Sequence, residues 1–147
     1  MRIISQQNPL WSKNKLGASS LTIGRFGCTT CGLSMLSDYF GCYKDPVQIQ
    51  QFQKYTPDGL VLWNTLNLPK MAFEIRRYGA NHAAIQASLK HPDKAVLLEV
   101  NHSHWVVALG KVPLVDAYFI ADPWSGSKTT TYKYKNAISG SAHFVRK

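Results

Sequence analysis

Apolar residues recur every three or four positions between Leu33 and Phe40, which is the spacing of one face of an α-helix. Gly41 follows, in the position where many helices end with a residue in the left-handed conformation. The pattern predicts a helix over residues 28–40, preceded by a glycine-containing turn. Cys28 is then the first residue of that helix.

Shorter elements surround this predicted helix. Asp45 and Pro46 form a good helix start, because aspartate caps the N-terminus and proline fits the first turn. They predict a short helix over residues 47–55, and a second one is expected over residues 82–89. Residues 63–78 favour a helical piece followed by an extended one.

The second half of the chain has the pattern of a β-sheet. Residues 95–100, 105–110 and 117–122 are short apolar runs typical of buried strands. Thr, Tyr and Lys alternate over residues 129–135, which predicts a half-exposed strand, and residues 143–145 are expected to close the sheet. Helices followed by strands indicate an α+β fold, with an N-terminal helical half whose central helix packs on a C-terminal antiparallel sheet.

Composition limits the class of protein. A chain of 147 residues with 45% hydrophobic residues is expected to fold, and we predict one domain over residues 1–147. No apolar run approaches the roughly 20 residues that span a bilayer. The N-terminus lacks the hydrophobic core of a signal peptide, so we expect synthesis in the cytoplasm without one. We also expect a monomer.

Charge indicates the kind of partner. Lys and Arg number 17 against 8 Asp and Glu, which gives a net charge of +9. Such a field attracts polyanions, including nucleic acid, anionic lipid and the acidic polymers of a bacterial envelope. The basic residues are scattered, and no arginine-rich helix, zinc-finger or RNP pattern is present. Specific recognition of nucleic acid is therefore not supported.

The three cysteines cannot all pair, which argues against a disulfide framework. Cys28 and Cys31 form a Cys-x-x-Cys motif, but no second cysteine or histidine pair completes a zinc site, and no thioredoxin-like context surrounds it. We therefore expect no metal and no cofactor. A helix N-terminus favours the thiolate of Cys28, which makes it a candidate nucleophile; a buried structural cysteine is the alternative.

Thiol catalysis needs a histidine and a group that orients it. His104 opens an apolar strand that would hold its backbone rigidly, and His102 precedes it by two residues. Asp122 ends the next strand, and a hairpin of these two strands would make Asp122 and His104 neighbours. The alternatives are a structural histidine and a turn aspartate before proline. The other histidines are His82, His91 and His143.

These residues carry a resemblance to the C39-like peptidase family, which has the papain-like fold. Four patterns are similar: an N-terminal Gln-x-Asp-Pro-x-Trp followed by Leu-Gly, a Thr-Ile-Gly-x-x-Gly-Cys turn, a His-Trp-Val-Val strand and an Asp-Pro-x-x-Gly turn. They correspond in this chain to residues 6–11 with 16–17, 22–28, 104–107 and 122–126. Asn8 stands where the first pattern has Asp. The resemblance spans nearly the full length of the chain.

The resemblance implies that Cys28 is the nucleophile, His104 the general base and acid, and Asp122 the residue that orients the imidazole. It also implies that Gln6 donates to the oxyanion of the tetrahedral intermediate, although Gln7 beside it leaves this donor ambiguous. Cys31 falls on the same side of the helix as Cys28. It is either a packing residue or an alternative nucleophile.

The expected function is hydrolysis of amide bonds by a Cys-His-Asp triad. The small basic chain suggests a phage-type endolysin, an antimicrobial endopeptidase that degrades cell-wall peptidoglycan. Its partners are then a peptide substrate and anionic envelope polymers, and its site of action is the bacterial cell wall. The alternatives are a protease that processes a protein or leader peptide and a catalytically inactive papain-like binding module. The further hypothesis of a nucleic-acid binder rests on the net charge alone.

Overall fold

One antiparallel sheet of six strands forms the centre of the molecule. The computed structural model covers residues 1–147. The strands lie in the order β1-β6-β2-β3-β4-β5, and every neighbouring pair is antiparallel. Their bounds are β1 Met71–Tyr78, β2 Lys94–Val100, β3 His104–Lys111, β4 Tyr118–Asp122, β5 Ser127–Thr130 and β6 Ile138–Arg146.

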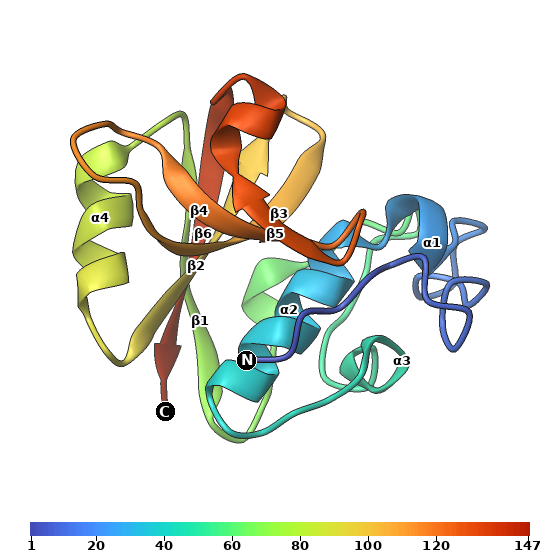
Figure 1. The fold of residues 1–147 in the computed structure, drawn as a ribbon. Coiled ribbons are helices and arrows are strands. Elements are labelled where there is room, and N and C mark those ends of the chain that lie inside the picture. Colours follow the sequence, from blue (N-terminus) through green and yellow to red (C-terminus); the bar gives the residue numbers. More distant parts are fainter.

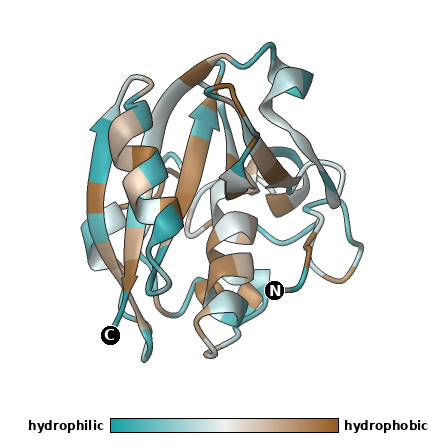
Figure 2. Ribbon diagram, turned by 60° about the vertical axis from the view of Figure 1, so that its left-hand side comes forward, coloured by the Kyte–Doolittle hydropathy of each residue, from teal (hydrophilic) through white to brown (hydrophobic).

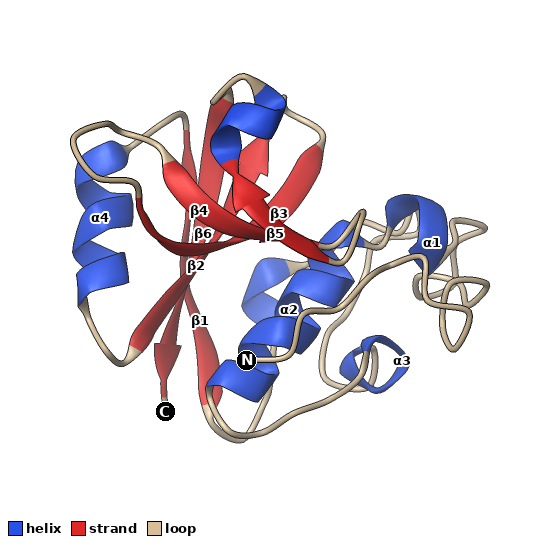
Figure 3. Ribbon diagram, viewed as in Figure 1, coloured by secondary structure: helices blue, strands red, loops and turns tan.

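Helices cover both faces of this sheet. Figure 1 shows α4 on one side and α2, with α1 and α3, on the other. Most of the chain beside α2 is loop (Figure 3). The bounds are α1 Ile23–Phe26, α2 Cys28–Tyr39, α3 Pro46–Ile49 and α4 His82–Lys90, with 3₁₀ helices η1 Trp63–Thr65 and η2 Thr131–Tyr134. The predicted α+β architecture is confirmed, and it is compatible with a papain-like fold.

The core has two parts because side chains alternate across the sheet. Leu97 and Val107 belong to the larger cluster of 20 buried residues, which includes α2. Leu98 and Val106 belong to a cluster of 9 buried residues on the α4 side. Brown, hydrophobic residues accordingly gather on the strands and on α2 in Figure 2. The sheet is therefore apolar on both faces where the helices cover it.

The central helix forms as its apolar spacing predicts. α2 runs from Cys28 to Tyr39, and Gly41 adopts a positive φ of 82° just beyond its end. Gly32 faces the sheet, where a Cβ atom would lie 3.0 Å from a methyl group of Leu97. Helix and sheet therefore approach closely at this point, where α2 packs on β2.

The helix predicted over residues 47–55 is shorter in the structure. Asp45 caps α3 as expected and forms a capping box with Gln48. The helix ends at Ile49, and the buried Gln53 instead donates to the carbonyl of Leu62 at 2.6 Å. The chain after Ile49 is therefore held by a hydrogen bond from the Gln53 side chain to the backbone of a loop, and not by further helical hydrogen bonds.

The strand predicted over residues 129–135 is wrong in its second part. β5 ends at Thr130, and η2 follows. Thr131 is fully buried; its hydroxyl accepts from the backbone N–H of Tyr118 at 3.1 Å and donates to Asn136 at 2.6 Å. These bonds hold Thr131 inside the protein at the start of η2. In a continued strand, Thr131 would instead have paired with β4.

The strand expected over residues 143–145 is part of the longer β6. It does not lie at an edge of the sheet, because it pairs with β1 on one side and β2 on the other. The fully buried side chain of Phe144 fits this interior position. No helix of the protein is both long enough and apolar enough to cross a bilayer.

Candidate active site

Cys28 occupies the first turn of α2, directly after a tight junction with α1. A Cβ atom on Gly27 would lie 2.5 Å from the carbonyl oxygen of Ile23, so the junction requires glycine. The backbone N–H groups of the first helical turn have no partner within the helix. The helix dipole and these donors favour a negative charge at Cys28, whose residue is 8% exposed.

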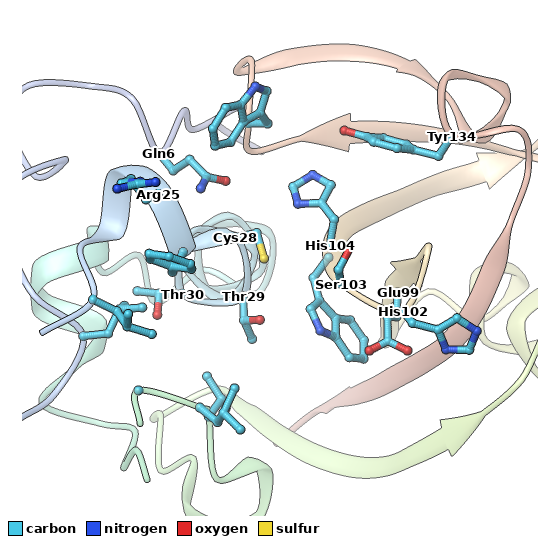
Figure 4. Close-up of a pocket in the computed structure, with 18 residues that line it drawn as sticks. Gln6, Arg25, Cys28, Thr29, Thr30, Glu99, His102, Ser103, His104 and Tyr134 are labelled. Carbon is cyan, nitrogen blue, oxygen red and sulfur yellow. The ribbon is translucent and has the colours of Figure 1, made fainter. Parts of the chain in front are cut away.

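His104 and Asp122 lie side by side at one end of the β3–β4 hairpin. β3 begins at His104 and β4 ends at Asp122. His104 Nε2 lies 2.8 Å from Asp122 Oδ1. The neighbourhood expected from the hairpin is therefore present. Nδ1 of His104 is not engaged by this bond, and the ring extends into the cleft beside the sulfur of Cys28 (Figure 4).

Asp122 is fully buried and both of its carboxylate oxygens are engaged. Oδ1 also accepts from the backbone N–H of Trp124 at 3.0 Å, while Oδ2 accepts from Lys133 Nζ at 2.6 Å and from the hydroxyl of Tyr134. Burial alone would raise the pKa of Asp122, but the bonds to His104, Lys133, Tyr134 and Trp124 outweigh it and lower that pKa well below its usual value. Asp122 is therefore a carboxylate at neutral pH.

His104 is poised to carry a proton. Burial alone would lower the pKa of its imidazole, but the hydrogen bond to Asp122 and the proximity of Cys28 outweigh burial and raise the pKa to about 9. The imidazolium is then the dominant form at neutral pH. Its positive charge then lies next to the carboxylate of Asp122.

Gln6 reaches the same cleft from the N-terminal arm. Its residue is 1% exposed, its side-chain Nε2 donates to the carbonyl of Gly24 at 3.2 Å, and its Oε1 has no hydrogen-bond partner. Gln7 is exposed and donates to the same carbonyl at 2.7 Å, but it does not line the cleft. Of the two glutamines, only Gln6 lines the cleft that contains Cys28.

Cys31 lies one helical turn from Cys28 and is fully buried. Burial, and then the proximity of Cys28, raise the pKa of this thiol far above its ordinary value. Cys31 does not line the cleft. It packs in the larger core cluster, as the packing interpretation of Cys31 expects.

These side chains meet in a cleft of about 600 Å³ between the helical half and the sheet. Figure 4 shows Cys28, Gln6 and Arg25 on one wall and His104, Ser103 and Glu99 on the other. Apolar residues extend both walls. They are Leu16, Leu21, Phe26, Leu60, Val61, Trp105 and Trp124.

The remaining histidines do not join Cys28. His102 lines the cleft, but its ring points away from Cys28 in Figure 4. His143 is buried between the hydroxyls of Ser88 and Ser141, at 2.9 and 2.8 Å, and His82 bonds the hydroxyl of Tyr118. No group of three or more His, Cys, Asp or Glu side chains is arranged to hold a metal ion.

Sequence reasoning missed Lys133 and Tyr134. Their alternation with neighbouring residues favoured a strand, in which two successive side chains point to opposite faces. In η2 both instead reach the same carboxylate oxygen of Asp122. No local signal distinguishes this arrangement, because the bond partner lies more than ten residues away in the chain.

The model of the Peptidase C39 family matches residues 25–138, well over half of the chain. The chain belongs to this family. It is accordingly a cysteine peptidase. The matched region contains Cys28, His104 and Asp122. It begins at residue 25 and therefore does not include Gln6. Neither the search of curated proteins nor the search of solved structures gives a match.

Proposed function

We propose that the protein hydrolyses amide bonds with a Cys28–His104–Asp122 triad. The observation that carries the proposal is the 2.8 Å contact between His104 and a fully buried Asp122, with Cys28 at a helix N-terminus in the same cleft. A nucleophile, a base and an orienting group are thus present together. The complete triad also argues against the alternative of an inactive binding module.

In the first half of the reaction, the Cys28 thiolate attacks the amide carbonyl carbon and a C–S bond forms. The oxyanion of the tetrahedral intermediate accepts from the backbone N–H of Cys28 and from Gln6. The C–N bond then breaks, and His104 donates its proton to the departing amine. The product of this half-reaction is a thioester on Cys28.

In the second half, neutral His104 takes a proton from water as the water oxygen attacks the thioester. The C–S bond breaks, the carboxylic acid leaves, and the thiolate–imidazolium pair is restored. Asp122 holds the imidazole throughout and stabilises its charged form. Lys133 and Tyr134 keep Asp122 in place through Oδ2.

For the substrate, we propose peptidoglycan peptides and an action of the phage-lysin type at the bacterial cell wall. The support is the net charge of +9, which favours encounter with a polyanionic envelope. The cleft is also open and carries exposed aromatic residues, Phe26 and Trp124, at its walls. The second candidate is processing of a protein or leader peptide, which membership of the C39 family also allows.

The test compares two substrates. Purified protein is incubated with cell-wall sacculi and with casein, and released muropeptides are analysed by mass spectrometry. We expect loss of turbidity with sacculi, and we expect Cys28→Ala to lower the rate by about 10⁴-fold or more. Cys42→Ala, which changes a part-buried cysteine outside the cleft, is the matched control.

The possible results separate the candidates. Cleavage of casein alone would overturn the peptidoglycan proposal and favour the processing protease. A Cys28→Ala variant as active as the wild type would overturn the triad itself. Released muropeptides with a new amine and a new carboxylate show that an amide bond, rather than a glycosidic bond, was cut.

A further inference from the structure

The walls of the cleft carry opposite charges. Glu99 is the single acidic residue that lines the cleft, and Arg25 is the single lysine or arginine. They extend from opposite walls in Figure 4, on either side of Cys28. Arg25 forms no ion pair, whereas Glu99 is held by neighbours. The protein has a net charge of +9, so a carboxylate inside the substrate cleft has the opposite sign to the protein as a whole.

Glu99 occupies a fixed place in the sheet. It lies in β2, opposite Trp105 of β3 and Gly140 of β6. By the alternation along β2 it shares a face with the buried Leu97, the face that packs against α2. Its side chain is 14% exposed, and that exposure is toward the cleft.

Two contacts orient the carboxylate and leave room for a third. Ser139 Oγ donates to Oε1 at 2.9 Å, and Arg76 Nη2 lies 3.4 Å from Oε2. Arg76 reaches across Gly140, and its guanidinium occupies the space where a Cβ atom of that residue would lie. A carboxylate accepts about four hydrogen bonds, and these contacts use only part of that capacity.

The surroundings suit a long side chain with a cationic end. Leu60, Val61 and Trp105 line the cleft together with Glu99 and provide apolar contact for methylene groups. A lysine-like side chain buries its methylenes on apolar surface and presents its ammonium to a carboxylate. Arg25 on the opposite wall repels the same ammonium. The two charges therefore favour one orientation of the bound side chain, with its ammonium toward Glu99.

We propose that Glu99 forms a subsite for a primary amine on the substrate peptide, so that the enzyme selects peptides with a lysine-like side chain near the scissile bond. This inference rests on the proposed function, because the subsite acts on a peptide bound at Cys28. It names the substrate class: a peptide with a free side-chain amine, bound with that amine away from Arg25.

The test uses covalent probes, so that no natural cleavage site need be known. Tripeptidyl acyloxymethyl ketones alkylate a nucleophilic cysteine with loss of the carboxylate leaving group. Lys, norleucine or Glu is placed in turn at each peptide position, with Ala elsewhere, and the second-order rate of Cys28 labelling is measured by mass spectrometry. At one position we expect Lys to label roughly tenfold faster than Glu.

Variants assign this preference to Glu99. Glu99→Gln keeps the size of the side chain and one acceptor oxygen but removes the charge, and we expect the Lys:Glu ratio to fall to about one. Glu99→Lys is expected to invert it. Glu74→Gln makes the same charge change at an ion pair with Lys94 outside the cleft, and the ratio should stay as in the wild type. Unchanged norleucine labelling shows that each variant is folded.

The labelling experiment distinguishes failure of the proposed peptidase site from failure of the Glu99 subsite. If no probe labels Cys28, the proposed nucleophile is wrong, and the subsite is overturned with it. If probes label Cys28 at rates that do not depend on their charge, or if Glu99→Gln keeps the preference for Lys, the peptidase proposal stands and the subsite alone is overturned.

Discussion

At the scale of single residues, the charges around His104 balance. In the proposed mechanism, a thiolate at Cys28 and the carboxylate of Asp122 carry two negative charges, and the imidazolium and Lys133 carry two positive ones. Lys133 Nζ lies 2.6 Å from Asp122 and competes with His104 for the same carboxylate. Lys133 therefore holds Asp122 ionised while limiting how strongly Asp122 favours the imidazolium.

This balance predicts the alkaline limit of activity. Because the pKa of His104 is raised to about 9, kcat/KM should fall as pH rises through that value and the imidazolium that protonates the leaving amine is lost. Lys133→Met removes a positive charge near the imidazolium, so the pKa of His104 should rise and the limit should move to higher pH by roughly half a unit or more. The measurement is kcat/KM from neutral to alkaline pH.

Lys135→Met is the matched control, because Lys135 is exposed two residues away and forms no ion pair. Its alkaline limit should equal that of the wild type. A limit that moves to lower pH in Lys133→Met would contradict this account of the charges. Lys133→Arg should restore the wild-type limit, since it keeps the positive charge near Asp122.

At the scale of elements, the junction between α1 and α2 sets the position of Cys28. Gly27→Ala would bring a Cβ atom against the backbone of Ile23, which cannot yield as a flexible side chain would. We expect a loss of about 1–3 kcal/mol in the free energy of unfolding. We also expect kcat/KM to fall about ten- to a hundredfold, because the nucleophile follows directly. Urea unfolding and peptide hydrolysis measure the two effects.

Gly110→Ala provides the comparison. Gly110 lies in β3, and an added Cβ atom would meet nothing within 4 Å. Its unfolding free energy should stay within about 0.5 kcal/mol of the wild type. If Gly27→Ala were as stable and as active as Gly110→Ala, the junction would not control the nucleophile.

The elements also show what the sequence allowed and what it did not. The order of strands 105–110 and 117–122 was enough to place His104 near Asp122, because the start of one strand of a hairpin lies beside the end of the other; the register shift between Ala108 and Gly110 was not predictable. The end of α3 and the turn into η2 were not predictable, since Gln53, Lys133 and Tyr134 bond to residues distant along the chain. Local pattern carries no information about those partners.

The two glutamines illustrate the same limit. Gln6 and Gln7 are adjacent, and nothing in their types distinguishes them. The choice depends on the backbone of the N-terminal arm, where the N–H of Gln6 donates to the carbonyl of Pro123 at 2.8 Å. This bond ties the arm to the turn that follows Asp122 and directs the side chain of Gln6 into the cleft.

At the scale of the whole molecule, the proposed triad is divided between two layers. Cys28 comes from the helical half, whereas His104 and Asp122 come from the sheet. Their distance therefore depends on how α2 packs against β3, through the larger of the two core clusters. Core residues far from the cleft, such as Leu97 beneath Gly32, thus support the geometry of the reaction.

The net charge of +9 acts over longer distances than any of these contacts and predicts a dependence on salt. The screening length falls from about 30 Å at 0.01 M to about 8 Å at 0.15 M ionic strength, so encounter with a polyanionic wall should weaken over this range. We expect the initial rate on sacculi to fall about tenfold. Hydrolysis of a small uncharged peptide should change little, because it gains nothing from the field.

The paired substrates make this prediction specific. A general effect of salt on the enzyme would lower both rates together, and only loss of electrostatic attraction lowers the rate on sacculi alone. Substituting scattered surface lysines such as Lys13, Lys15 and Lys128, none of which forms an ion pair, should reduce the rate on sacculi at low salt and flatten its salt dependence. Equal salt dependence on sacculi and on the small peptide would contradict a role of the net charge in wall encounter and would remove the main support for peptidoglycan as the substrate.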